Sequence, residues 1–292
     1  QLYKVGTVKL AEEGIEEFSL DAWYLLEHIY GISRVDFLMR RSDSFDAAQM
    51  EKSTAYQALI RQRSEGFPVQ YLTGSTEFMG LPFLVNEHVL IPRQDTEVLV
   101  EEAISRMRNL EKPQILDMCT GSGCILLSLL LELPQALGTG VDVSEGALCV
   151  AKENRKRLGL EQRAELIQSN LFSADYFQKN SGNDHMEYDM LISNPPYIRT
   201  EDIEGLMEEV RFHDPVLALD GKENGLYFYE KITEQAGTYL KPGGWLMYEI
   251  GCDQGMDVSE IMKKNGFEQI EIKKDLAGLD RVVTGRKMQE EQ

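Results

Sequence analysis

The sequence predicts an α/β protein with a mostly parallel sheet that is covered by helices on both faces. From residue 113 onward, short apolar segments alternate with longer helical patterns, as strands of a parallel sheet require. The first 75 residues lack this alternation and have a helical pattern throughout. The chain has 292 residues, 42% of them hydrophobic, so it can build one large domain or two modest ones.

Residues 1–75 are predicted to form a small helical domain. In the stretch SLDAWYLLEHIYG, Ser19 is a candidate N-cap, apolar residues recur at helical spacing, and Gly31 is a candidate stop. A second helix is expected from about Phe45 to Arg63, followed by a glycine and a proline. Because no cluster of chemically reactive residues occurs here, this domain is more suited to partner recognition than to catalysis.

Residues 76–94 are predicted to form a β-hairpin linker. Short aromatic and β-branched runs are punctuated there by glycine and proline, and a helix is expected to open near Asp95. The polar stretch RQDTE, residues 93–97, fits the first turn of that helix, where acidic side chains are favourable. It could instead face a pocket, but its composition favours an ordinary helix start.

Residues 95–292 contain the alternating pattern. The predicted strands are QILDMC, GTGVDV, AELIQS, YDMLIS, GWLMYEI, FEQIEI and RVVTG. The expected helices are CILLSLLLELP, SEGALCVAKENRKRLG, GLYFYEKITEQAGTYL and one from about Met256. The polar run FQKNSGNDHME, residues 177–187, is expected to be a surface loop. Ligands of such sheets bind at the carboxyl ends of the strands, so the site is expected there.

The charge of the chain argues against binding of nucleic acid. With 30 Lys and Arg against 49 Asp and Glu, the formal net charge is −19, and such a surface should repel a duplex unless a local basic patch forms. The four cysteines show neither metal-ligand spacing nor a disulfide framework, and each of the four histidines, His88 included, is interpreted as a surface or core residue. No metal is expected.

The chain shows no sequence feature of a membrane or secreted protein. No apolar run approaches the roughly 18 residues of a membrane-spanning helix. The first residues are also too charged for a signal peptide. A cytoplasmic protein without a membrane partner is therefore expected, and we expect it to be a monomer.

A glycine-rich turn follows the first strand of the alternating region. Residues 117–123 read DMCTGSG, and Asp142 ends the next strand. The glycines let the backbone approach a ligand, the following helix offers N–H groups, and Asp142 can accept both hydroxyls of a ribose. An NAD site is one possibility, but its G-x-G-x-x-G fingerprint fails because Leu126 stands where the third glycine belongs. S-adenosylmethionine fits better, since it has no pyrophosphate.

A second motif, Asn194-Pro195-Pro196-Tyr197, ends a later strand and should open onto the same crevice. A planar amide or exocyclic amine is a poor nucleophile and must be held in place. Asn194 Oδ1 and the Pro195 carbonyl can each accept one N–H, the prolines fix the direction of that carbonyl, and the Tyr197 ring can stack on the planar group. These four residues are the predicted substrate-binding set, with Asn194, Pro195 and Tyr197 as catalytic residues. The alternative is a rigid turn with a packed tyrosine.

The alternating region resembles the class I, Rossmann-like S-adenosylmethionine-dependent methyltransferases. More narrowly, the chain resembles the peptide chain release factor glutamine methyltransferase family (PrmC/HemK). Between about residue 68 and 285, PVQYLTGSTEFMGLPFLVNEHVLIPRQDTE, NPPYI, ALDGKENGLYFYEKI, YEIG and AGLDRVV match this family in order. The resemblance implies N5-methylation of the glutamine amide in the Gly-Gly-Gln loop of class I release factors. S-adenosyl-L-homocysteine would be the product, and the helical domain would help to dock the release factor.

Two departures from the family occur at the predicted cofactor site. Cys119 stands where the family usually has glycine, and Asn170-Leu171 stand where it tends to have Asp-Trp. The predicted cofactor-binding residues are Cys119, Thr120, Gly121, Ser122, Gly123, Asp142, Asn170, Leu171 and Asn194.

Two alternative functions are consistent with the same motifs. An adenine-N6 nucleic-acid methyltransferase would use Asn194-Pro195-Pro196-Tyr197 on a flipped base, but the missing basic surface argues against it. A catalytically silent S-adenosylmethionine-binding protein would keep the fold and lose turnover, and only Cys119 favours that interpretation.

Overall fold

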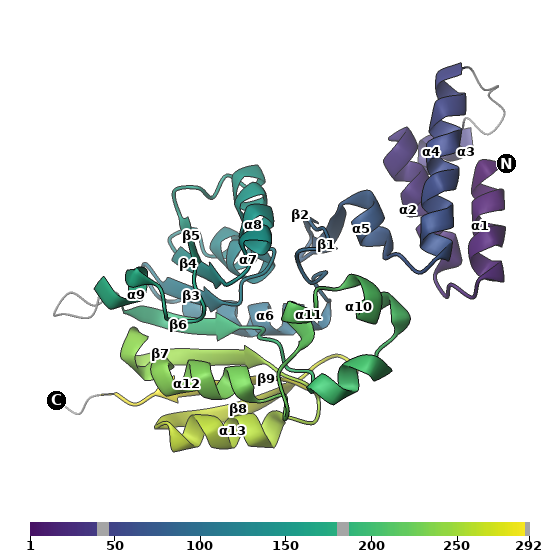
Figure 1. Ribbon diagram of the computed structural model, residues 1–292. Coiled ribbons are helices and arrows are strands. Elements are labelled where there is room, and N and C mark those ends of the chain that lie inside the picture. Colours follow the sequence, from purple (N-terminus) through teal and green to yellow (C-terminus); the bar gives the residue numbers. More distant parts are fainter. Residues whose placement is uncertain (40–46, 180–186, 290–292) are drawn as a thin grey trace. The chain divides into compact units, whose positions relative to one another are not determined.

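A computed structural model describes residues 1–39, 47–179 and 187–289 of the protein (Figure 1). The chain forms two compact units. The first consists of residues 1–75 together with 207–213, and the second consists of residues 76–206 together with 214–292. None of the described helices has the length and apolar character needed to cross a membrane.

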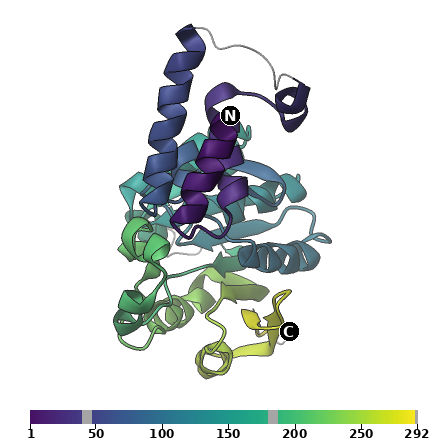
Figure 2. The ribbon, with the colours of Figure 1, turned by 90° about the vertical axis from the view of Figure 1, so that its right-hand side faces the viewer.

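The first unit is helical, as predicted. Its helices are α1 (Leu2–Glu12), α2 (Phe18–Tyr30), α3 (Arg34–Met39), α4 (Ala47–Ser64), α5 (Val69–Thr73) and α10 (Glu208–His213). Helix α1 lies beside α2 and α4 (Figures 1 and 2). A Cβ at Gly6 of α1 would lie 2.2 Å from the Tyr56 hydroxyl oxygen of α4, so only glycine allows this close approach. A buried ion pair, with 2.6 Å between Arg63 Nε and Asp21 Oδ2, joins α4 to α2.

Helix α2 ends as the sequence predicts but begins differently. Gly31 follows it in the left-handed conformation with φ 63°, which glycine adopts without steric cost. The prediction of Ser19 as N-cap is wrong, because Glu17 occupies that position and the Ser19 hydroxyl instead hydrogen-bonds the Tyr3 hydroxyl at 2.8 Å. The second predicted helix is α4, and its expected start at Phe45 lies outside the described residues.

The second unit contains the predicted seven-stranded sheet, with strand order β5-β4-β3-β6-β7-β9-β8. Its strands are β3 (Gln114–Met118), β4 (Leu137–Asp142), β5 (Ala164–Gln168), β6 (Tyr188–Ser193), β7 (Leu240–Glu249), β8 (Phe267–Lys274) and β9 (Asp280–Lys287). Strands β3 to β7 run parallel, whereas β9 is antiparallel to β7 and β8. The predicted mostly parallel α/β fold is confirmed.

Helices cover both faces of this sheet (Figure 1). The helices of the second unit are α6 (Asp95–Met107), α7 (Cys124–Glu132), α8 (Glu145–Arg157), α9 (Asp175–Lys179), α11 (Val216–Leu219), α12 (Tyr227–Tyr239) and α13 (Gly255–Lys264), with a 3-10 helix at Thr200–Gly205. Adjacent strand residues belong to different core clusters. Ile115 packs in the cluster that includes α6 and α7, and Leu116 packs in the one that includes α12 and α13. This alternation explains why central strands such as β3 and β6 are largely apolar and buried.

The predicted hairpin is formed by β1 (Ser75–Phe78) and β2 (Leu81–Leu84). Asn154 of α8 holds β2, because its amide accepts from the Leu84 N–H at 2.7 Å and donates to the Leu84 carbonyl at 3.1 Å. The expected surface loop over 177–187 is partly wrong. Residues 177–179 complete α9, where Phe177 is buried in the core, and residues 180–186 lie outside the described residues.

Candidate functional site

The register of the sheet brings the two predicted motifs together. Met118 at the end of β3 pairs with Val141 on one side and with Ser193 on the other. The residues that follow these partners, Asp142 and Asn194, therefore emerge at the same edge of the sheet. The chain leaves β3 toward β4 on one side and β6 lies on the other, so this edge is a topological switch point, where α/β proteins bind ligands.

A cavity with about 1130 Å³ of empty space opens at this edge. The cavity is lined by residues that follow the hairpin, by residues at the ends of β3, β4 and β6, and by the segment after His213. The lining includes Glu87, His88, Val89, Leu90, Pro92, Arg93, Thr96, Cys119, Thr120, Gly121, Ser122, Asp142, Asn170, Leu171, Asn194, Pro196, Pro215, Leu217, Ala218 and Phe228.

The glycine turn is held by two carboxylates. The Gly121 N–H donates to Asp142 Oδ2 at 2.9 Å, and the Thr120 hydroxyl donates to Asp117 Oδ2 at 2.6 Å. The second oxygen of Asp142 accepts from the Ser144 N–H at 2.9 Å, so the carboxylate is fixed in direction. Burial raises the pKa of Asp142, and these N–H groups partly offset that effect. The carboxylate lines the cavity and retains lone pairs for hydroxyl donors.

Asp117 makes the stability of this turn depend on pH. Burial raises its pKa to about 7, against an ordinary value of 3.8. Between these pH values the unfolded chain has released the proton while the folded chain keeps it. The contribution of Asp117 to the free energy of unfolding is therefore complete at low pH and is lost as the pH rises through 7. We expect Asp117→Asn to gain stability over the wild type by about 1 kcal/mol per pH unit in this window.

Urea unfolding of both proteins at about pH 5 and about pH 7 measures this effect, because all other titrating groups are shared. A stability difference that stays constant between the two pH values would contradict it.

Cys119 adopts a left-handed backbone conformation with φ 62°. A Cβ at such a φ carries a strain of about 1–2 kcal/mol, which glycine avoids. Burial also raises the pKa of its thiol, so the side chain stays neutral. The departure from the family's glycine is therefore accommodated with strain, and the turn still closes through Gly121 and Asp142.

The backbone strain at Cys119 is testable with a pair of variants that both remove the thiol. We expect Cys119→Gly to unfold at higher urea concentration than Cys119→Ala, by about 1 kcal/mol in unfolding free energy, because only alanine keeps the strained Cβ. Equal stability of the two variants would show that the backbone is not strained here.

The second motif places Asn194 and Pro196 on the cavity, whereas Pro195 and Tyr197 are not among the residues that line it. Asn194 Nδ2 donates to the Thr96 hydroxyl at 3.5 Å, which leaves its Oδ1 as an acceptor. Among the predicted cofactor residues, Gly123 does not line the cavity; it precedes α7 with φ 80°. The roles assigned to these residues stay predictions.

Several lining residues were not predicted. Glu87, His88, Val89 and Leu90 follow the hairpin, and His88, interpreted as surface or core, borders the cavity. The stretch at 93–97 begins α6 as expected, yet Arg93 and Thr96 also face the pocket. The alternation of apolar and polar residues carried no signal for these positions, and only the match of the whole segment to the family did.

The cavity fits S-adenosylmethionine in the chemistry of its donors and acceptors. Asp142 offers a fixed carboxylate for ribose hydroxyls. Ser122, also on the wall, has a buried hydroxyl without a hydrogen-bond partner among the residues that the structure describes, so it is available to a ligand. Leu171, with φ 51°, and Phe228 supply apolar surface for a planar base.

Comparison with known proteins agrees with this geometry. Residues 1–74 match the family described as PrmC N-terminal domain, and residues 94–213 match the methyltransferase small domain. A release factor glutamine methyltransferase from Geobacter sulfurreducens is 41% identical over 278 residues, which is 95% of this chain and 92% of that protein. The one from Fusobacterium nucleatum is 38% identical over 95% of this chain and 76% of its own length.

Among solved structures, the hMettl16 catalytic domain in complex with MAT2A 3'UTR hairpin 6 is 13% identical, with a TM-score of 0.56 over 82% of each chain. At that identity the similarity shows a methyltransferase fold alone. The sequence relatives are far more specific. By its identity to them over nearly its whole length, the chain belongs to the release factor glutamine methyltransferase family.

Proposed function

We propose that this protein transfers a methyl group from S-adenosylmethionine to N5 of the glutamine side chain in the Gly-Gly-Gln loop of class I release factors, and so acts in translation termination. The observation that carries the proposal is the shared cavity. The glycine turn with Asp142 and the Asn194 motif border the same space, at the ends of β3, β4 and β6. Curated relatives carrying the name of this activity support it.

Asn194 and Pro195 would hold the substrate amide. Because Asn194 Nδ2 is engaged with Thr96, its Oδ1 is left to accept one N–H of the glutamine amide. The Pro195 carbonyl would accept the other N–H, so the nitrogen lone pair is aimed into the cavity. These acceptors raise electron density on a weak nucleophile, and positioning carries most of the catalysis.

The cofactor would occupy the side of the cavity formed by the glycine turn. Asp142 would bind the ribose hydroxyls, Ser122 and the turn N–H groups would bind the methionine end, and Asn170-Leu171 would contact adenine. When bound, S-adenosylmethionine supplies an electrophilic methyl group on a sulfonium, with S-adenosylhomocysteine as the leaving group and loss of one proton from the methylated nitrogen. The apolar residues of the wall, Leu171 and Phe228 among them, would exclude water from the transfer.

The partner assignments form part of the same proposal. The helical unit, residues 1–75, would help to dock the release factor. The net charge of −19 favours a protein substrate over free nucleic acid. We infer that the protein works as a monomer in the cytoplasm, together with its release factor substrate.

A methyl-transfer assay with competing substrates tests the function. The purified protein is incubated with labelled S-adenosylmethionine and one of three substrates: a class I release factor, the same factor carrying Gly-Gly-Glu in place of Gly-Gly-Gln, or RNA and DNA. Label is expected on the first factor only. Label on RNA or DNA, with none on the factor, would assign the site to adenine methylation, and cofactor binding without any transfer would identify a silent protein.

A further inference from the structure

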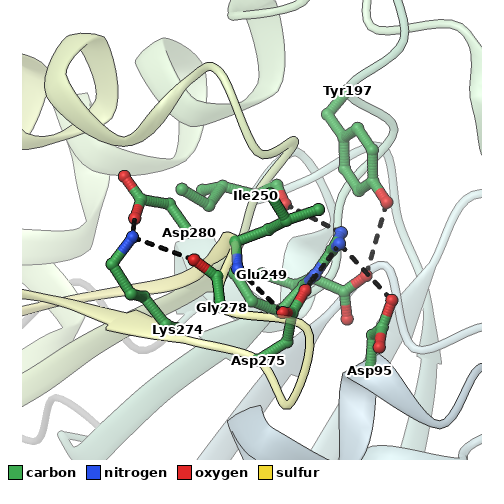
Figure 3. A network of polar contacts seen from close by, with 10 residues as sticks. Asp95, Tyr197, Glu249, Ile250, Lys274, Asp275, Gly278 and Asp280 are labelled. Atoms are coloured by element: carbon green, nitrogen blue, oxygen red, sulfur yellow. Dashed lines mark hydrogen bonds and ion pairs between the residues drawn. The ribbon is translucent and has the colours of Figure 1, made fainter.

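A buried carboxylate lies directly behind the Asn194 motif. Ser193 of β6 pairs with Tyr248 of β7, so the next residue of β7, Glu249, lies beside Asn194. Glu249 is 2% exposed, and its Oε1 accepts a hydrogen bond of 3.4 Å from the Tyr197 hydroxyl. Figure 3 shows the Tyr197 hydroxyl directed at this carboxylate.

Glu249 has no ion-pair partner within residues 1–39, 47–179 and 187–289, and its Oε2 accepts no hydrogen bond there. The nearby Arg281 guanidinium is engaged elsewhere. It pairs with Asp275 at 3.0 Å and with Asp95 at 3.4 Å, and it donates to the Ile250 carbonyl at 3.3 Å (Figure 3). A buried carboxylate without an ion pair is destabilising, so a structural role alone does not explain it.

The backbone of the motif is held without the help of the Glu249 carboxylate. Gln254 Nε2 donates to the Tyr197 carbonyl at 3.0 Å and to the Gly225 carbonyl at 3.2 Å. The Tyr229 hydroxyl donates to the Glu249 carbonyl at 2.9 Å. What remains for the Glu249 side chain to fix is the direction of the hydroxyl groups around it.

The directions of these hydrogen bonds matter because an ionised carboxylate only accepts. The Tyr197 hydroxyl must donate to it, and so must the Thr96 hydroxyl, whose side-chain hydrogen bond lowers the pKa of Glu249. A Thr96 oxygen that donates to Glu249 is left to accept from Asn194 Nδ2, as observed at 3.5 Å. Asn194 lines the cavity, and its Oδ1 is then left as the acceptor that a glutamine N–H needs.

We propose that Glu249 is a positioning residue, which acts through Thr96 to orient the Asn194 amide and through a direct hydrogen bond to orient Tyr197. The inference rests on the proposed function, since it explains how that site presents acceptors to an amide. The substitution Glu249→Gln would place an NH2 donor beside the Tyr197 and Thr96 hydroxyls. The hydrogen bonds that hold the Asn194 amide in one orientation would then be lost.

Steady-state kinetics of Glu249→Gln tests this role. Loss of a hydrogen-bond pattern built on a charged group should lower kcat about 10- to 100-fold, with the KM for release factor nearly unchanged. Affinity for S-adenosylmethionine by calorimetry should stay within about twofold. The Tm near pH 7 should not fall, because an unpaired buried charge is removed.

Two further comparisons separate positioning from general damage. Thr96→Val should lower kcat as Glu249→Gln does, and Thr96→Ser, which keeps the hydroxyl, should restore it. The matched control is Asp189→Asn at the opposite end of β6, where a carboxylate holds the Gln114 N–H at 2.8 Å and Lys241 Nζ at 2.8 Å. This control should lower stability without changing kcat.

The pH profile gives a further readout. Burial raises the pKa of Glu249 to about 7, while Thr96, Arg281 and Tyr197 lower it and Asp95 raises it. Burial also raises the pKa of Tyr197, and the charges of Arg281 and Arg93 partly offset that effect. Wild-type kcat should rise with pH through this value, and Glu249→Gln should lack that limb. A Glu249→Gln enzyme with wild-type kcat and wild-type pH profile overturns the inference and leaves the proposed function intact. Absence of transfer by the wild type refutes the function itself.

Discussion

Asn194→Ala should abolish most of the methyl transfer while leaving the cofactor in place. Asn194 lines the cavity, and its Oδ1 is the proposed side-chain acceptor for the substrate amide. Its loss leaves the substrate amide held on one side only, so kcat should fall about 100-fold or more. Affinity for S-adenosylmethionine should change by less than about threefold, because the glycine turn and Asp142 are untouched. Single-turnover kinetics and calorimetry measure the two quantities.

Asn194→Asp is the matched comparison. It keeps an acceptor oxygen at the same place but loses the N–H that is donated to Thr96. It should retain more activity than the alanine variant. If Asn194→Ala keeps kcat and loses cofactor affinity instead, the residue belongs to the cofactor site and the substrate assignment is wrong.

Asp142→Ala should have the opposite effect, with cofactor affinity reduced about 100-fold, since hydrogen bonds to a charged acceptor contribute about 1.5–3 kcal/mol. Its carboxylate holds the turn through the Gly121 N–H and is the proposed acceptor for the ribose hydroxyls. With saturating S-adenosylmethionine, kcat should recover to within about tenfold of wild type, because the amide-binding residues are unchanged. Isothermal titration of the cofactor measures the loss.

Glu145→Gln supplies the control for Asp142. It removes a carboxylate in the first turn of α8, three positions further along, but its side chain is exposed and it does not line the cavity. Its cofactor affinity should equal that of wild type. Equal losses in both variants would mean that net charge, and not the fixed Asp142 carboxylate, determines binding.

The fold and the frame of the site follow from short-range patterns. Runs such as YDMLIS predict buried strands, and polar residues directly after them predict a site at one edge, which is where Asp142 and Asn194 lie. Gly31 correctly predicts the end of helix α2, but the helix begins before Ser19, whose hydroxyl hydrogen-bonds the Tyr3 hydroxyl and does not cap the helix. A local signal was overridden there by a tertiary contact.

The rest of the site depends on contacts between distant segments. His88 and Leu217 reach the cavity only after the chain has folded, and neither carries a marker of chemistry in its local sequence. The left-handed backbone at Cys119 is equally invisible, because cysteine rarely adopts it. Glu249 ends an apolar run as Asp142 does, yet its relation to Tyr197 needs the register between β6 and β7.

The central claim is that the amide nitrogen of one glutamine receives the methyl group. Its most direct test is the fragment mass spectrum of the peptide carrying the Gly-Gly-Gln loop, after incubation of a class I release factor with the protein and S-adenosylmethionine. The account predicts one added methyl, placed by the fragments on the side chain of that glutamine and strongly reduced with Asn194→Ala at the same incubation time. An unmodified glutamine, or a methyl on any other residue, would contradict it.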